Sequence, residues 1–202
     1  MKRYLLPFLL TGLLTACANE PIYPPAPAKA ASNADWMYLL GPGDSINVFV
    51  WGNPEVSGTF PIRPDGMVTM HLVEDLKASG KSTSQLAREI EKILGRYIQD
   101  PVVTVVVAGG VGPYSQQIRV VGQAAKPQAL NFRENMSLVD VMISVGGLAE
   151  FAAGNRASIL RIVDGKPQQF SVRLEDLVKG GDISANVEMR PGDLLVIPES
   201  WF

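Results

Sequence analysis

The chain has few of the side chains from which most catalytic and metal centres are built. Its 202 residues include one cysteine, Cys17, and one histidine, His71. A zinc site or a histidine-based catalytic triad would have to be assembled around that single imidazole. Cys17 has no second cysteine with which to form a disulfide. The composition therefore excludes an internal disulfide and any metal site that needs several histidines or cysteines.

Long hydrophobic runs and a strong net charge are also missing. The apolar run Tyr4–Leu14 is too short for a transmembrane helix, which needs about 20 residues, and no later run is longer. The chain has 18 Lys and Arg residues against 20 Asp and Glu residues, with no basic block. The sequence therefore predicts no membrane-spanning helix in the mature chain and no electrostatic surface for nucleic acid.

The remaining route to hydrolytic chemistry is a pair of carboxylates. Glu74 and Asp75 are adjacent, but neighbouring side chains on an extended chain diverge, and an acidic loop edge explains them equally well. His71 is most simply a partly exposed strand residue. The glycine-rich stretch 109–112 leads into Pro113 and not into a helix, so it lacks the helix N-terminus of a phosphate-binding loop. We predict no cofactor and no catalytic site, and the residues favour a binding or structural role.

The N-terminus contains a lipidation signal. Lys2 and Arg3 precede the apolar run, and Leu14-Thr15-Ala16-Cys17 follows it. This order is typical of a secretory signal peptide, here residues 1–16. It resembles the bacterial lipobox, in which the cysteine thiol is diacylated before cleavage and the freed amine is acylated afterwards. Two other interpretations of Cys17 stay open, as a small buried residue or as the tail of an ordinary signal peptide.

Lipid on Cys17 would anchor the mature chain to a membrane. Each buried methylene contributes roughly 0.8 kcal/mol, so two or three acyl chains attach lastingly. Ala18 stands where an aspartate would hold an enteric lipoprotein at the inner membrane, and this resemblance implies the periplasmic face of the outer membrane. Residues 17–35, rich in alanine and proline, predict an extended tether. The alternative is irregular coil packed on the body, near Asp35 and Trp36.

Turns rich in proline and glycine divide the next part of the chain into strands. Gly41-Pro42-Gly43-Asp44 is a turn that precedes an alternating strand over 45–51. Pro64-Asp65-Gly66 is a hairpin signal. We expect it to join two short strands that pair with each other, over 60–63 and 67–71.

A helix and an apolar strand complete this unit, residues 36–108. Ser82 and Gln85 form a capping-box pair at the start of the helix. The apolar residues that follow share one helical stripe: Leu86, Ile90, Ile93, Leu94 and Tyr97. Residues 102–107 are apolar at nearly every position, which predicts a central strand covered on both faces.

A second unit, residues 114–202, follows the break at 109–113. We expect its strands over 118–122, 128–132, 157–163, 168–172 and 193–197. Ser137 opens a short helix that Gly146-Gly147 ends. Pro191-Gly192-Asp193 precedes the last strand as Pro42-Gly43-Asp44 precedes the first, so we interpret this step as a recurring turn device and not as a sequence repeat. The predicted fold class is α+β, with two small mixed domains.

The order of these motifs resembles that of the outer-membrane polysaccharide export lipoproteins. Five segments of residues 36–108 carry the resemblance to the family's N-terminal export domain: Tyr38-Leu39-Leu40-Gly41-Pro42-Gly43-Asp44, Ile46-Asn47-Val48, Val50-Trp51, Ile62-Arg63-Pro64-Asp65-Gly66 and Ile98-Gln99-Asp100-Pro101-Val102-Val103. Three segments of residues 114–202 resemble the soluble-ligand-binding β-grasp domain that accompanies it: Val120-Val121-Gly122-Gln123, Ser137-Leu138-Val139-Asp140-Val141 and Gly146-Gly147-Leu148.

The resemblance implies a non-enzymatic part of an export conduit. In this family a ring of identical lipoproteins stands between an inner-membrane polysaccharide co-polymerase or chain-length regulator and the outer membrane, and passes glycan outward. The chain stops directly after its last predicted strand, so it is similar to the short type without a C-terminal pore helix. That type implies a separate outer-membrane partner, such as a β-barrel. Trp201 and Phe202 would dock on this partner or cap the core.

Three hypotheses therefore stay open on the sequence. The first is an exopolysaccharide or capsule export component that forms ring oligomers. The second is a periplasmic lipoprotein that binds a small ligand or glycan without transport. The third is an enzyme that trims polysaccharide with a pair of acids facing one cleft.

Overall fold

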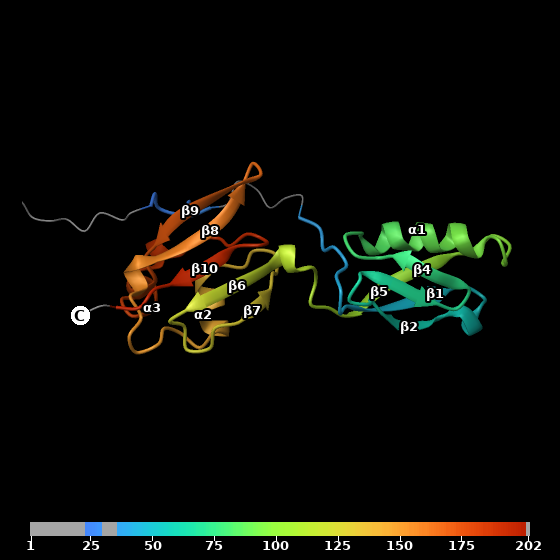
Figure 1. The fold of residues 1–202 in the computed structure, drawn as a ribbon, viewed down its shortest axis with the longest axis horizontal. Coiled ribbons are helices and arrows are strands. Elements are labelled where there is room, and N and C mark those ends of the chain that lie inside the picture. The colour runs from blue at the N-terminus through green and yellow to red at the C-terminus, as the bar shows by residue number, and fades with distance from the viewer. Residues whose placement is uncertain (1–22, 30–35, 201–202) are drawn as a thin grey trace, which may run out of the picture.

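The computed structural model describes residues 23–29 and 36–200. Figure 1 shows two units that lie one after the other along the long axis of the molecule, each with its own sheet and helix. The fold class is α+β, as predicted. Within the described residues, no helix is both long enough and apolar enough to span a bilayer.

The first unit combines two small antiparallel sheets with one long helix. Its three-stranded sheet has the order β2-β1-β5, and its second sheet pairs β3 with β4. The strands are β1 (Ser45–Val50), β2 (Gly58–Pro61), β3 (Met67–Met70), β4 (Val73–Lys77) and β5 (Val103–Gly109). On β1 the alternate residues Ile46, Val48 and Val50 point inward and are at most 1% exposed. A 3-10 turn, Pro54–Val56, follows β1.

Helix α1 (Thr83–Leu94) begins where the capping signal predicts. The Ser82 hydroxyl accepts the backbone N–H of Gln85, and the Gln85 side chain accepts the Ser82 N–H. Leu86, Ile90 and Leu94 are fully buried in the first core. Tyr97 was predicted on this stripe, but it lies beyond the last helical residue and is 63% exposed.

Strand β5 differs from its prediction as a central strand covered on both faces. It lies at the edge of the sheet, paired only with β1 among the described strands, and β1 is the central strand. Val103 and Val105 point into the core, whereas Val102 and Val106 are more than half exposed. The apolar run therefore covers one buried face and one open face.

The turn Pro64-Asp65-Gly66 joins strands of different sheets, which corrects the predicted hairpin. Strand β2 pairs with β1, and β3 pairs with β4. The chain reverses at Arg63, whose carbonyl accepts the Gly66 N–H. The Arg63 N–H then donates to the Met67 carbonyl, and its guanidinium donates to the Thr69 hydroxyl. Strand β4, which the sequence analysis did not identify, takes the place of β2 as the partner of β3.

The second unit contains a five-stranded mixed sheet with the order β7-β6-β10-β8-β9. Its strands are β6 (Gln117–Gly122), β7 (Ala129–Asn131), β8 (Ala157–Val163), β9 (Lys166–Val172) and β10 (Leu194–Ile197). The last strand lies between β6 and β8, parallel to β6 and antiparallel to β8. Residues about 75 positions apart along the chain thus become neighbours at the centre of the sheet.

Two short helices and three 3-10 turns complete the second unit. Helix α2 (Leu138–Ser144) buries Leu138, Val141 and Met142 in the second core, and α3 (Leu174–Val178) buries Leu174 and Leu177. The 3-10 turns are Tyr114–Gln116, Gly154–Arg156 and Ile183–Ala185.

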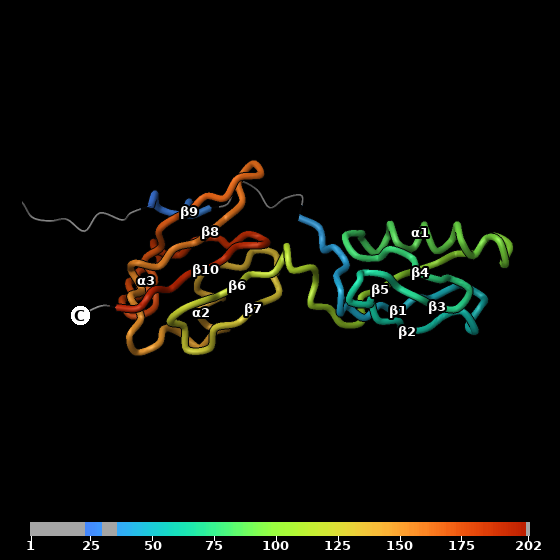
Figure 2. The backbone as a smooth tube through the Cα atoms, in the orientation of Figure 1, coloured from blue at the N-terminus to red at the C-terminus, as the bar shows by residue number. Residues whose placement is uncertain are grey.

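The segment 23–29 packs on the second unit, although the sequence predicted an extended tether there. The Pro24 carbonyl accepts the Ser171 N–H at 2.8 Å, and the Ala26 N–H donates to the Ser171 carbonyl at 3.0 Å. The Ala28 carbonyl accepts the Glu188 N–H. Figure 2 shows this segment in blue beside β9. Seven residues of the predicted tether are therefore part of the folded body.

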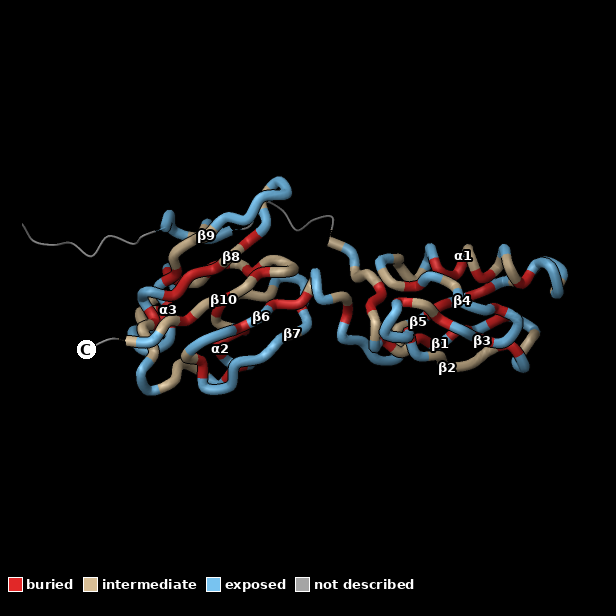
Figure 3. Tube along the Cα trace, in the orientation of Figure 1, coloured by how far each residue is buried: buried red, intermediate tan, exposed pale blue. Residues whose placement is uncertain are grey.

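Each unit has its own hydrophobic core, and Figure 3 shows the buried residues gathered inside each one. The first core runs from Leu40 to Val105, and the second from Ile118 to Ile197. Trp36 packs against the second core, edge-on to Phe132 with ring centroids 5.1 Å apart. Among the described residues, the chain thus contacts the second unit at 23–29 and at Trp36, forms the first unit, and returns to the second.

Two segments cross between the units and hydrogen-bond to each other. The Gln116 side chain donates to the Met37 carbonyl and accepts the Leu39 N–H. A Cβ atom placed on Gly41 would lie 2.4 Å from the backbone of Gly112, so only glycine permits this close crossing.

Candidate functional site

The first predicted turn buries an aspartate at the junction of the two units. Asp44 is 0% exposed. Its Oδ2 accepts the Tyr38 hydroxyl and the Gly41 N–H, each at 2.8 Å. Its Oδ1 accepts the backbone N–H groups of Val111 and Gly112, at 2.8 and 2.9 Å. The glycine-rich stretch therefore binds an anion after all, and that anion is the chain's own carboxylate.

The second Pro-Gly-Asp turn also buries its aspartate. The Asp193 side chain is 1% exposed and forms a two-pronged ion pair with Arg161, from Nε at 2.9 Å and from Nη2 at 2.7 Å. The Arg190 N–H donates to the same carboxylate. Pro191 and Gly192 complete this turn, and Gly192 has a φ of 86°. Both aspartates are buried and hydrogen-bonded within turns, and neither lines the cavity described below.

The other predicted turn residues lie at the surface or at a helix end. The exposed Asp65 carboxylate accepts the Met67 N–H and pairs with Arg63, while Gly66 has a φ of 78°. Hydrogen bonding by Met67, its largest cause, holds the pKa of Asp65 below the usual range. Gly146 and Gly147 follow α2 with φ values of 78° and 89°.

No acid pair faces a cleft near His71. The His71 ring lies edge-on to Phe60 with centroids 5.7 Å apart. Asp75 pairs with Arg63 at 2.5 Å on the surface, and Glu74 is exposed beside it. Within residues 23–29 and 36–200, no cluster of three or more His, Cys, Asp or Glu side chains could hold a metal ion. Cys17, Trp201 and Phe202 lie outside the described residues.

The candidate binding site is a cavity of about 400 Å³ in the second unit. Its volume falls at the small end of the usual range for ligand pockets. Tyr23, Pro25, Ala26 and Ala28 of the N-terminal segment form one wall. The opposite walls come from the end of β9, the start of β8 and the turn that begins at Ile183.

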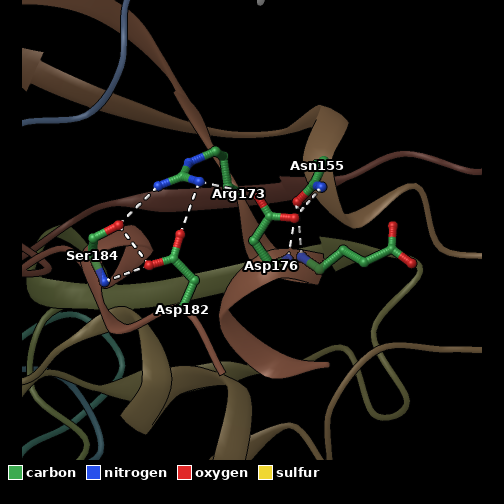
Figure 4. A network of polar contacts seen from close by, with 6 residues as sticks. Asn155, Arg173, Asp176, Asp182 and Ser184 are labelled. Atoms are coloured by element: carbon green, nitrogen blue, oxygen red, sulfur yellow. Dashed lines mark hydrogen bonds and ion pairs between the residues drawn. The ribbon is translucent and has the colours of Figure 1, made fainter. Parts of the chain in front are cut away.

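A fixed polar network borders this cavity. Figure 4 shows the Arg173 guanidinium reaching Ser184 on one side and two aspartates on the other. Its Nη1 contacts Asp182 at 2.9 Å and Asp176 at 3.0 Å, and its Nη2 donates to the Ser184 hydroxyl. Asn155 donates to Asp176 at 2.7 Å. These contacts hold the guanidinium in one place without any ligand.

The charge on Asp182 is favoured by its neighbours. The Ser184 hydroxyl, which donates to Asp182 at 2.6 Å, is the main cause that lowers the pKa of Asp182 below its usual range. The Ser184 N–H and Arg173 act in the same direction. Asp182 is therefore ionised at neutral pH. The ionised Asp182 carboxylate accepts hydrogen bonds from Ser184 and Arg173. It therefore suits the positioning of these two side chains and not proton transfer to a substrate.

The sequence analysis did not find this cavity. Its lining residues come from four separate parts of the chain, and most of them are alanines, serines and valines. The arginine, aspartates and serine over 173–184 are the only polar pattern that could have pointed to it. Such a pattern is equally typical of a solvated surface. The docking of 23–29, which completes the cavity, had no periodic pattern that could predict it.

Comparison with known proteins finds a family match for the first unit. Residues 32–108 match the family model described as Polysaccharide biosynthesis/export protein. This range covers the whole of the first core, from Leu40 to Val105.

The chain is also similar to curated proteins over most of its length. It is 25% identical over 187 residues to the EPS I polysaccharide export outer membrane protein of Ralstonia nicotianae, across 80% of this chain and 47% of the relative. It is 26% identical over 162 residues to a polysialic acid transport protein of Escherichia coli, across 79% of this chain and 28% of the relative. It is 30% identical over 148 residues to an exopolysaccharide production protein of Rhizobium meliloti, across 64% of this chain and 34% of the relative.

The chain spans less than half the length of each of these relatives. Its similarity nevertheless extends into both units, because each alignment covers at least 64% of the chain, which is more than either unit contains even with the residues before the first unit. Residues 32–108 therefore match the polysaccharide biosynthesis/export protein family, and the chain as a whole is similar to proteins named for polysaccharide export and transport.

Proposed function

We propose that this chain is a non-enzymatic component of a conduit that exports exopolysaccharide or capsule through the cell envelope. The match of residues 32–108 to the export family carries the proposal. The relatives from Ralstonia and Escherichia are named for the export or transport of a polysaccharide. The buried carboxylates of Asp44 and Asp193 are occupied by backbone N–H groups, the Tyr38 hydroxyl and Arg161.

The proposed domains follow the two cores. Residues 36–108 form the export domain and residues 114–202 form a β-grasp domain, with a signal peptide over 1–16 and a lipidated segment over 17–35. Residues 23–29 of that segment dock on β9. We propose that Cys17 carries the lipid that holds the chain at the periplasmic face of the outer membrane.

Assembly into a ring of identical subunits is the next part of the proposal. A single chain of this size has no room for a channel, and a closed ring needs two complementary surfaces on each subunit. The outer face of the β2-β1-β5 sheet supplies one candidate surface, because Phe49, Trp51, Val102 and Val106 are exposed there. The strand residues of this face include no charged side chain. Exposed apolar patches on folded domains are typical contact surfaces.

The proposed partners follow from this placement. An inner-membrane polysaccharide co-polymerase or chain-length regulator would deliver the glycan, and an outer-membrane protein would complete the exit. We expect no nucleic-acid partner.

The decisive experiment is deletion of the gene followed by complementation with the full chain. Secreted and cell-surface polysaccharide should fall at least tenfold in the deletion strain and return on complementation, without loss of the cytoplasmic sugar precursors. Normal secretion in the deletion strain would contradict the proposal. Native mass spectrometry of the lipidated chain in detergent then tests the ring, and monomers at every concentration would exclude it.

Lipidation is tested separately. Cys17→Ser should abolish labelling by a radioactive fatty acid and leave the chain unprocessed or soluble, because serine cannot form the thioether. Ser32→Ala, in the same predicted segment, is the control and should label normally. Label that persists on the Cys17→Ser chain would show that another residue carries the lipid.

The second candidate function is a periplasmic lipoprotein that binds a glycan or small ligand without transport. The cavity of about 400 Å³ is the observation that favours it. Ligand binding by the purified chain, together with normal secretion in the deletion strain, would select this function over export.

A further inference from the structure

We propose that the cavity behind the N-terminal segment binds one or two rings of an uncharged sugar and that the bound sugar fastens this segment to β9. The inference rests on the proposed function, because it takes its ligand from the polymer that the conduit would carry. It names a binding site and a ligand class for the second unit, whereas the family match covers only the first unit.

The floor of the cavity is apolar and belongs to the second core. Ala157, Val172, Ala185 and Val187 line the cavity and are between 1% and 6% exposed. Three of the four N-terminal lining residues are Pro25, Ala26 and Ala28, whose side chains are small and rigid. Sugar rings present a face of C–H groups, and such a face packs well on an apolar floor of this kind.

The rim offers hydrogen-bonding groups that match the hydroxyls of a sugar. Tyr23 and Ser171 contribute hydroxyl groups, Asn155 contributes an amide and Arg173 contributes a guanidinium. Ligand pockets commonly combine an apolar lining with a few polar groups that fix orientation. Tyr23 and Ser171 lie on the two segments that the N-terminal hydrogen bonds join, so one ligand can touch both.

The local charges select an uncharged ligand. Arg156 and Arg173 line the cavity with two positive charges. Asp176 and Asp182, bound to Arg173, supply two negative charges. The two aspartates do not line the cavity themselves, but they bring the net charge of the four groups to zero, so an anionic sugar would find no net positive charge there. A neutral sugar loses no ionic solvation when it enters.

Binding should strengthen the docking of the N-terminal segment. The segment contributes one wall of the cavity and is held by few backbone hydrogen bonds, those of Pro24 and Ala26 to Ser171 and of Ala28 to Glu188. A ligand that contacts both walls stabilises the docked arrangement by mass action. Local opening of this segment should therefore become rarer when sugar is bound.

The experiment uses the full lipidated chain in lipid nanodiscs, because detergent tails could enter an apolar cavity. The probe is a set of short oligosaccharides released by mild acid from the secreted polysaccharide and separated into neutral and anionic fractions. Saturation-transfer NMR should detect binding of the neutral fraction and at least tenfold weaker binding of the anionic fraction. Absence of neutral binding, or preference for the anionic fraction, would overturn the inference. Displacement of the sugar by palmitate would do so as well, because it would identify an acyl-chain site.

Two variants separate the cavity from the rest of the surface. Ala28→Trp places a large ring into the cavity and should reduce sugar binding at least tenfold. Pro27→Trp is the matched control, because Pro27 lies next to Ala28 in the same segment and does not line the cavity. Equal binding by both variants would place the sugar elsewhere and overturn the inference.

Amide hydrogen exchange measures directly whether bound sugar stabilises the docked N-terminal segment. Saturating neutral oligosaccharide should slow exchange of the Ala26 and Ser171 amides at least fivefold, while the Val48 amide in the first unit should not change. An unchanged exchange rate of the Ala26 amide with sugar bound would show that the sugar does not fasten the segment to β9. Secretion by the deletion strain, measured independently, decides the proposed function, so the two ideas can fail separately.

Discussion

Asp44 and Asp193 hold the same position in two turns and accept the same bond. Each carboxylate accepts the backbone N–H of the residue three positions earlier, Gly41 or Arg190, at 2.8 Å. Beyond that shared bond the two differ, because Asp44 is satisfied by neutral donors and Asp193 by the cation Arg161. Pro-Gly-Asp is thus one local device placed in two environments.

Replacement of Asp44 by asparagine should destabilise the chain strongly. An amide can present one oxygen to one pair of donors, so its NH₂ group would face the other pair and leave those donors unpaired. We expect a loss of about 2–4 kcal/mol in the free energy of unfolding. Urea unfolding followed by circular dichroism measures it. Asp65→Asn, on the exposed turn, is the control and should cost much less, because solvent screens its contacts. Equal losses would show that burial of Asp44 is not the cause.

The stability of the chain should fall at high pH because of Tyr38. Burial, followed by its hydrogen bond to Asp44, raises the pKa of Tyr38 above the ordinary value of 10.0. A pKa raised in the folded state favours the neutral phenol, so this contribution is complete below pH 10 and is lost as the pH rises above it. Tyr38→Phe should flatten this alkaline decline in urea unfolding between about pH 10 and pH 12. An identical decline in wild type and variant would assign it to other groups.

The buried ion pair gives a graded test in the second unit. Arg161 and Asp193 are 2% and 1% exposed. Arg161→Met leaves the Asp193 charge unpaired and should cost about 3–5 kcal/mol. Arg161→Lys keeps the charge but loses the second prong, so its cost should be smaller. Differential scanning calorimetry should rank the variants in that order. A variant with lysine that is less stable than the one with methionine would contradict this account.

The apolar face of the first sheet should control assembly. Trp51 is 71% exposed and lies edge-on to Phe49 with centroids 6.3 Å apart. A glutamate at this position would bring a charge into the proposed subunit contact, where its desolvation is unfavourable. Trp51→Glu should reduce the assembled fraction in native mass spectrometry at least fivefold with little change in thermal stability. Tyr97→Glu, at an exposed aromatic outside this face, is the control. Full assembly of the Trp51→Glu chain would move the contact to another surface.

Local signals in the sequence predicted local structure well. The capping pair Ser82 and Gln85 predicted the first residue of α1 within one position, because that signal lies in side chains and backbone three positions apart. The alternation over 45–51 predicted β1 for the same reason. The glycine pair at 146–147 marked the end of α2.

Long-range relationships could not be read in this way. Val102 and Val106 look like core residues in the sequence, but a run of valines is compatible with a central strand or with an edge strand that leaves one face open. The parallel pairing of β6 with β10 depends on the whole sheet. The docking of Pro24 and Ala26 uses backbone groups alone, so no side-chain pattern marks it. The cavity could not be predicted for the same reason, since this segment forms one of its walls.

The double crossing between the units determines how a mechanical load would travel through the molecule. The chain enters on the second unit, at the bonds of Pro24 and Ala26 to Ser171 and at Trp36 against Phe132, before it forms the first unit. Tension applied at the N-terminal end meets these contacts first and is transmitted into the second core. The first unit follows these contacts along the chain, so its sheet would keep its geometry under such a load.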